Sequence, residues 1–177
     1  MERLRESWGA PRVALAGFVL RFLFFLWVFS TAVLRIPDAV HLKLQEGTAI
    51  LEYGLMSLFT DRVTRHSNVL IYDGFGVEIV AECFGLLEMA IYSAAVLAFA
   101  TTWRKRAIGI GVGVPIIFFF NFTRILMLVI VGRYSRALFD FAHLYFWQAT
   151  LIVVITALWL LWVRYVVRDE TGPVVHA

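Results

Sequence analysis

Three residues of this chain belong to types that could do chemistry together, and each lies in or beside an apolar segment. Cys83 is the only cysteine, so it forms no disulfide within the chain and must serve packing, metal binding or reactivity. Arg124 lies inside an apolar run, where a charged side chain is costly and marks a functional site by default. His143 lies at the edge of another apolar run. A nucleophile, a cation and a proton carrier together indicate acyl transfer at a membrane surface.

The chemistry of the three groups fits this interpretation. A thiol, whose ordinary pKa is ~8.5, becomes a good nucleophile at neutral pH when a cation or a histidine stabilises its thiolate. His143 could accept that proton and return it to a leaving amine. Arg124 cannot act as a base, but its donors suit a developing oxyanion. Asn121 lies one helical turn before Arg124 and could orient it or donate to the same oxyanion. Glu82 could bind a basic substrate feature or simply be solvated.

Structural roles remain open for the same residues. A lone cysteine is often a small buried apolar side chain. His143 lies among Phe141, Tyr145 and Trp147 and could be one more interfacial ring, while Arg124 could satisfy the carbonyls of a broken helix. The similar depth that we predict for Cys83, Arg124 and His143 favours a site. No His, Cys or Asp spacing resembles a metal site, and we expect no cofactor.

The composition predicts a membrane protein. Hydrophobic residues make up 61% of the 177 residues, whereas about half is usual in soluble domains. The first apolar run is too long for a signal peptide, so we expect it to remain as an anchor. We predict a single all-α integral membrane domain over residues 1–177, a bundle of four spanning helices, each near the ~20 residues that cross a bilayer. The predicted spans are residues 13–34, 84–102, 107–131 and 144–167.

Charge predicts the orientation. The short basic turn Trp103-Arg104-Lys105-Arg106 between the second and third spans marks the cytoplasmic side. With four spans, both termini then lie in the cytoplasm, and Cys83, Arg124 and His143 all lie toward the outside. The net charge of +3 comes from basic residues that flank apolar segments, so it indicates topology and no affinity for nucleic acid.

Residues 36–81 form the one long connection, which we expect to be an outer cap. After Pro37 and Asp38, one helical face carries Ile50, Leu51, Leu55, Leu58 and Phe59, while Glu46, Glu52 and Asp61 lie elsewhere. This pattern predicts a helix in the outer interface, or equally one docked on the bundle. Residues 69–72 and 76–80 flank Asp73-Gly74-Phe75 and predict a β-hairpin. The hairpin leads to Cys83, so it could be a lid, a substrate-docking edge or a simple connector.

Several strings resemble the exosortase/archaeosortase family of membrane-embedded sorting enzymes. They are Glu82-Cys83-Phe84-Gly85, the run from Phe120 to Ile125 that contains Asn121 and Arg124, and His143 at the start of the last span. The resemblance covers roughly residues 73–164. The short length and the run from Leu138 to Gln148 are most similar to the small, H-type exosortases.

The resemblance implies a cysteine transpeptidase of the plasma membrane. Its substrates are exported proteins with a C-terminal sorting tail, made of a short motif, a transmembrane helix and a basic cluster. Cleavage would leave a thioester on Cys83, which an acceptor amine or water resolves; Arg124 takes the essential arginine position and His143 the third. Relatives commonly carry a small or polar residue where this chain has Phe84. The alternative is a non-enzymatic membrane subunit that binds an envelope partner, with Cys83 and Arg124 structural.

Overall fold

A computed structural model describes the backbone of residues 2–168 and the side chains of residues 13–81 and 83–168. Most of the described chain is helical, with one small antiparallel sheet. In chain order the elements are α1 (Glu2–Leu34), α2 (Asp38–Ser57), β1 (Val63–His66), β2 (Val69–Tyr72), β3 (Phe75–Glu78), η1 (Ala81–Phe84), α3 (Leu86–Ala98), α4 (Trp103–Tyr134), α5 (Arg136–Phe141), η2 (Ala142–Phe146), α6 (Trp147–Trp162) and η3 (Val163–Val167).

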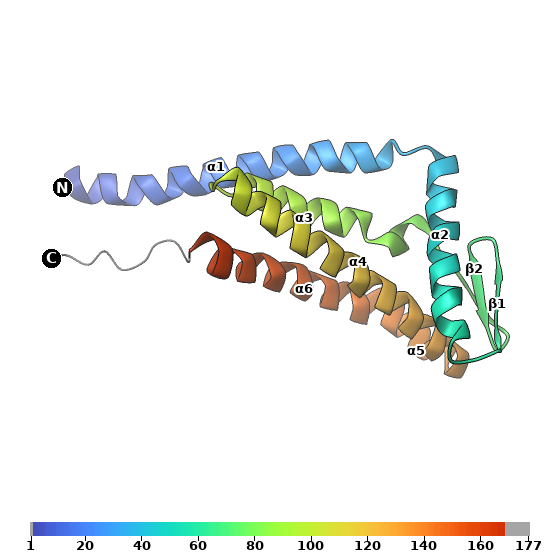
Figure 1. Ribbon diagram of the computed structural model, residues 1–177. Coiled ribbons are helices and arrows are strands. Elements are labelled where there is room, and N and C mark those ends of the chain that lie inside the picture. The colour runs from blue at the N-terminus through green and yellow to red at the C-terminus, as the bar shows by residue number, and fades with distance from the viewer. Residues whose placement is uncertain (1, 169–177) are drawn as a thin grey trace.

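Four helices, α1, α3, α4 and α6, run alongside one another (Figure 1). The helix α2 and the sheet lie together at one end, called here the cap end; α4 begins at the other, called the basic end after residues 104–106 (Figure 1). Three helical segments are long and apolar enough to cross a membrane, namely Val13–Leu34, Trp103–Tyr134 and Arg136–Val167. Their exposed surfaces are rich in large apolar side chains, as expected of a multi-pass membrane protein.

The second predicted span, residues 84–102, is shorter than expected. Its helix α3 has 13 residues, or ~20 Å at 1.5 Å per residue, against a hydrocarbon core of ~30 Å. It begins two residues late, because η1 and the left-handed Gly85 (φ 69°) precede it, and it ends four residues early, because Phe99 is extended (ψ 134°). The helix α3 nevertheless packs along α1, α4 and α6. Its crossing of the membrane, and with it the total of four spans, stays a prediction.

The starts of the third and fourth predicted spans also differ from the structure. The basic run Trp103–Arg106 is the first turn of α4 and not a loop, since arginine and lysine are good helix formers. Lys105 Nζ donates to the Val167 carbonyl (3.0 Å) and Arg106 Nη2 to that of Phe99 (3.0 Å), which joins the helix ends here. The last helical segment begins at Arg136, before the predicted residue 144.

Two glycines of α4 allow close packing near the basic end. A Cβ on Gly113 would lie 2.2 Å from the ring of Tyr92, and one on Gly109 would lie 2.6 Å from Trp162 Nε1. The Tyr92 hydroxyl donates to the Gly109 carbonyl (3.0 Å), and Trp162 Nε1 donates to that of Lys105 (2.9 Å). The glycines thus bring α3 and α6 against α4 and hold the bundle that supports the cap.

One face of the cap helix α2 packs against the rest of the protein, and another face is exposed. Ile50, Leu51 and Phe59, part of the predicted apolar face, are exposed on or just after it, where they can meet the bilayer interface. Glu52 does lie off that face, as predicted. However, it is fully buried beside Ala49 on the face that packs toward the sheet and α4.

The cap sheet has three antiparallel strands in the order β1-β2-β3. The strands β2 and β3 form the hairpin at the predicted place. Asp73 (φ 52°) and Gly74 (φ 86°) make its two-residue turn, and two successive positive φ angles fit the type I′ turn that Asp-Gly favours. The strand β1, Val63–His66, is an addition that the sequence analysis did not predict.

Candidate active site

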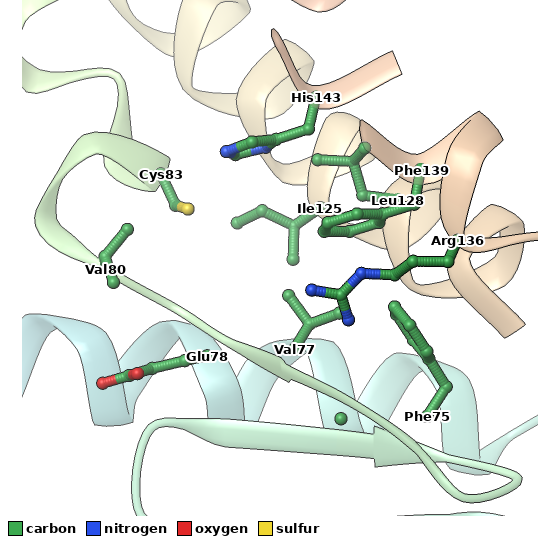
Figure 2. A pocket seen from close by; sticks show the side chains of 11 residues that line it. Phe75, Val77, Glu78, Val80, Cys83, Ile125, Leu128, Arg136, Phe139 and His143 are labelled. Atoms are coloured by element: carbon green, nitrogen blue, oxygen red, sulfur yellow. The ribbon is translucent and has the colours of Figure 1, made fainter. Parts of the chain in front are cut away.

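A cavity of about 280 Å³ lies at the cap end, where the sheet meets α4 and the last helical segment (Figure 2). Three separate parts of the chain line it: the strand β3 with the turn after it, the helix α4, and the residues from α5 to η2. The lining residues are Phe75, Gly76, Val77, Glu78, Val80, Cys83, Ile125, Leu128, Arg136, Phe139 and His143. Two of the three predicted catalytic residues, Cys83 and His143, therefore lie in one cavity.

Cys83 lies in the short 3₁₀ helix η1, between the sheet and α3. Its N–H donates to the Val80 carbonyl (2.9 Å), and only 7% of the residue is exposed. The sulfur points into the cavity beside Ile125 (Figure 2). Gly85 ends this turn with φ 69°, and a Cβ there would lie 2.2 Å from Asn121 Nδ2. Only glycine meets both conditions, which explains the Cys-x-Gly spacing in physical terms.

His143 approaches the same cavity from the other side. It belongs to η2, a π-helical turn between α5 and α6, and such turns are frequent at functional sites. Its ring stacks on Phe139, with centroids 5.6 Å apart and planes 5° from parallel. In Figure 2 the imidazole extends across the cavity toward the side on which Cys83 lies. Nδ1 is buried without a hydrogen-bond partner among the described residues, so one ring nitrogen is uncommitted.

Arg124 is buried behind the cavity wall. It lies on the inward face of α4 with 6% of the residue exposed, and the next residue, Ile125, lines the cavity. Its charge interacts with His143, although Arg124 itself does not line the cavity. Among the described residues, no carboxylate forms an ion pair with its guanidinium. Within the described part of the chain, Arg124 thus supplies a buried positive charge near His143 that has no carboxylate ion-pair partner.

Asn121 lies on the other side of Cys83. Together they line a much smaller cavity of about 10 Å³, and the ring of Phe84 lines it too. Asn121 Nδ2 donates to the Ile117 carbonyl (3.0 Å), while Oδ1 is buried without a hydrogen-bond partner among the described residues. The amide therefore contacts its own helix and Gly85 instead of orienting Arg124. Phe84 faces this packed side and is not among the residues that line the larger cavity.

The remaining charged candidates differ in their positions. The side chain of Glu82 lies outside the described residues, although its backbone belongs to η1. Arg136 lines the cavity, with its guanidinium 5.8 Å from the ring centre of Phe75 and 5.6 Å from that of Phe139. Arg133 forms an ion pair with Asp73 and does not line the cavity. Of the outer residues, His143 and Arg136 thus share the cavity with Cys83.

Two features of the cap end were not predicted from the sequence. The first is an aromatic wall formed by Phe75 and Phe139, whose ring centres are 5.4 Å apart. These two residues are distant in the chain, so the only local signal is the i, i+3 spacing of Arg136 and Phe139. The second is Glu52, which is fully buried with neither carboxyl oxygen hydrogen-bonded among the described residues. Desolvation by burial raises its pKa to about 8. Its helical spacing from Ala49 and Met56, both in the core that contains Cys83, is the signal that could have located it.

The helices and the cavity define a multi-pass membrane protein that holds a thiol and an imidazole together at one end of its helices. The model of the family described as Transmembrane exosortase (Exosortase_EpsH) matches residues 7–163. Because this match covers most of the chain, the protein belongs to the transmembrane exosortase family, whose members are sorting transpeptidases. The resemblance noted in the sequence is therefore confirmed at the level of the family. No curated protein and no solved structure matches the chain.

Proposed function

We propose that this exosortase is a cysteine transpeptidase that cleaves the C-terminal sorting tail of exported proteins and transfers the product to an acceptor nucleophile. The observation that carries the proposal is the shared cavity of Cys83 and His143. A thiol and an imidazole from distant parts of the chain converge there, and the bilayer-facing helices supply an apolar approach. This combination suits a polypeptide substrate whose own tail is embedded in the membrane.

The reaction begins with proton transfer. The His143 imidazole accepts the Cys83 proton, and the thiolate attacks the carbonyl carbon of the scissile peptide bond. The tetrahedral intermediate collapses, the C–N bond breaks, and the leaving amine takes the proton from the imidazolium. The exported protein is now a thioester on Cys83, and the tail is released. An acceptor amine, or water, then attacks the thioester carbonyl, gives its proton to His143 and regenerates the thiol.

Arg124 acts on this chemistry through its charge. A fixed cation near the site favours the thiolate over the thiol and stabilises the negative charge that develops on the carbonyl oxygen. Its burial supports this role, and so does the absence, among the described residues, of a carboxylate that pairs with the charge. Asn121 packs beside Cys83 and supports the wall of the site there. Glu82 directly precedes the nucleophile in the sequence.

The proposed orientation follows from charge. Residues 104–106 lie on the cytoplasmic side with both termini, and the cap end faces outward from the plasma (inner) membrane. A substrate tail would enter laterally from the bilayer. Its basic cluster would remain in the cytoplasm and set the depth of its helix, so that the motif just outside the membrane reaches the cavity.

The direct test is the replacement of the nucleophile. A reporter protein that carries the C-terminal tail of an exported protein from the same organism is expressed with wild type or with Cys83→Ala. Since the thioester cannot form without the thiol, we expect processing to fall by ~10³-fold or more and the uncleaved reporter to stay in the membrane. Immunoblotting of membrane fractions measures both forms.

A variant on the lipid side provides the matched control. Met127 lies on α4, is 45% exposed and does not line the Cys83 cavity. The Met127→Ala variant should therefore process the reporter normally. Normal processing by Cys83→Ala would contradict the proposal and favour a non-enzymatic membrane subunit in which Cys83 is structural.

A further inference from the structure

The strand β3 has an unpaired edge beside the catalytic cavity. In the sheet order β1-β2-β3, β3 pairs with β2 on one side only. The chain continues from β3 through Val80 to Cys83 within a few residues. In Figure 2 the strand crosses below the cavity, with Cys83, Ile125 and His143 on the side away from its neighbouring strand. The open edge of the sheet therefore faces the thiol.

The lining of the cavity shows that it follows the edge of this strand and not one of its faces. Side chains of successive strand residues point to opposite faces of a sheet. Nevertheless, all four residues of β3 line the cavity, namely Phe75, Gly76, Val77 and Glu78. A cavity over one face would be lined by alternate residues alone. Contact with all four is expected where the cavity runs along the backbone of the outer edge.

The hydrogen-bond pattern identifies the backbone groups at this edge. Tyr72 and Phe75 flank a two-residue turn, so they form a hydrogen-bonded pair, and bonded pairs alternate along an antiparallel hairpin. Ile79 continues the alternation, since its N–H donates to the Asn68 carbonyl (2.9 Å). The N–H and C=O groups of Gly76 and Glu78 therefore point away from β2. Within the described chain, no bond to another element occupies them.

We propose that the substrate segment around the scissile bond binds as an extended strand on the outer edge of β3. This inference rests on the proposed transpeptidase function and specifies how that site holds its polypeptide. Backbone groups of Gly76 and Glu78 bond the segment, which supplies affinity without regard to its side chains. Alternate substrate side chains meet the wall formed by Ile125 and Leu128, which favours apolar residues at those positions.

A proline at the edge tests the backbone bonds. Gly76→Pro removes the outward N–H, and proline is tolerated where a strand edge is open. We expect processing of the tail-bearing reporter to fall about tenfold, the effect of one lost hydrogen bond. Gly76→Ala is the matched control, because it keeps the N–H and its Cβ would meet only the side chains of Ile71 and Val69 at 3.7 and 3.8 Å. Because it keeps this donor, it should lose less processing than Gly76→Pro does.

Crosslinking gives a readout that does not depend on the proline variant's folding. Benzoylphenylalanine is placed at successive positions around the scissile bond of the reporter, and the reporter is trapped uncleaved by Cys83→Ala. An extended strand predicts crosslinks to α4 from every second position. Crosslinks at three- to four-residue spacing, or normal processing by a folded Gly76→Pro protein, would overturn the inference.

The two proposals fail in different ways. If Cys83→Ala processes the reporter, the transpeptidase function itself is wrong. If Cys83→Ala is inactive while Gly76→Pro is fully active and the crosslinks lack a two-residue period, only the docking on β3 is wrong.

Discussion

The buried polar groups at the two ends of the bundle differ in their hydrogen bonding. At the basic end, donors of α3, α4 and α6 are matched with backbone carbonyls, as in the bonds from Tyr92 to Gly109 and from Trp162 to Lys105. At the cap end, Glu52, Asn121 and His143 each keep a buried oxygen or ring nitrogen without a hydrogen-bond partner among the described residues. At the basic end, Arg106 Nε and Trp159 Nε1 are also buried without an acceptor among the described residues, but both atoms are donors.

The difference separates scaffold from site. Buried polar groups are ordinarily hydrogen-bonded, so each unpartnered one needs an explanation. At the cap end the explanation that we favour is function, because His143, whose Nδ1 has no hydrogen-bond partner among the described residues, lines the Cys83 cavity. At the basic end, glycines and aromatic rings pack closely, and their loss should affect stability first. Variants that change stability without changing activity, or the reverse, can therefore test this difference between the two ends.

The largest expected loss of stability comes from the basic end. Gly113→Val would place a Cβ 2.2 Å from the ring of Tyr92, and such overpacking typically destabilises by ~1–3 kcal/mol or more. Gly111→Val, two residues earlier on the same helix, is the control because nothing lies within 4 Å of its Cβ. Thermal unfolding in detergent should show a lower Tm for Gly113→Val alone. Equal Tm values for the two variants would contradict the close packing of α3 on α4.

A pH-dependent effect on stability is expected at the cap end. Burial raises the pKa of Glu52 from 4.5 to about 8, so the folded protein holds this proton more tightly than the unfolded chain. Its contribution to stability is complete below pH 4.5 and is lost as the pH rises to about 8, with a slope of at most ~1.4 kcal/mol per pH unit. Glu52→Gln imitates the protonated form and should remove this dependence.

The measurement for Glu52 is chemical unfolding between pH 5 and 9 in detergent. Glu46→Gln, on the same helix, is the control: its carboxyl is only partly buried and accepts a hydrogen bond from Ser67 (2.8 Å), so that variant should keep the pH dependence. A wild-type protein whose stability does not fall over this range would show that Glu52 is ionised in the fold.

Local patterns in the sequence predicted much of the fold. The apolar runs located the three long membrane helices, and Asp73-Gly74 located the β2–β3 hairpin. The strand β1 was missed because Val63–His66 is short and has no clear alternation of apolar and polar residues. The late start of α3 was missed because the left-handed Gly85 interrupts a continuous apolar run. The left-handed turn at Gly85 depends on its packing against Asn121. Because Asn121 is distant in the chain, a local sequence pattern does not reveal this contact.

The site was only partly predictable for a similar reason. Residue chemistry singled out Cys83, Arg124 and His143, and the structure brings Cys83 and His143 to one cavity and Arg124 behind its wall. Their mutual geometry depends on how η1, α4 and η2 pack, and these elements are far apart in the chain. Glu52 was placed off the apolar face of its helix, but its burial was not predicted, since a charged residue ordinarily avoids the interior. The fold overrides that rule here, which is typical of functional or strained positions.

The most direct test of the central claim is the pH dependence of Cys83 alkylation by a membrane-impermeant maleimide. Because Cys83 is the only thiol, the label reports on it alone. The wild-type protein is compared with His143→Ala and Arg124→Ala in intact cells. We predict labelling from outside with a midpoint below that of an ordinary thiol, near ~8.5, and a higher midpoint in both variants. An ordinary or unreactive thiol, unchanged by either substitution, would contradict the account.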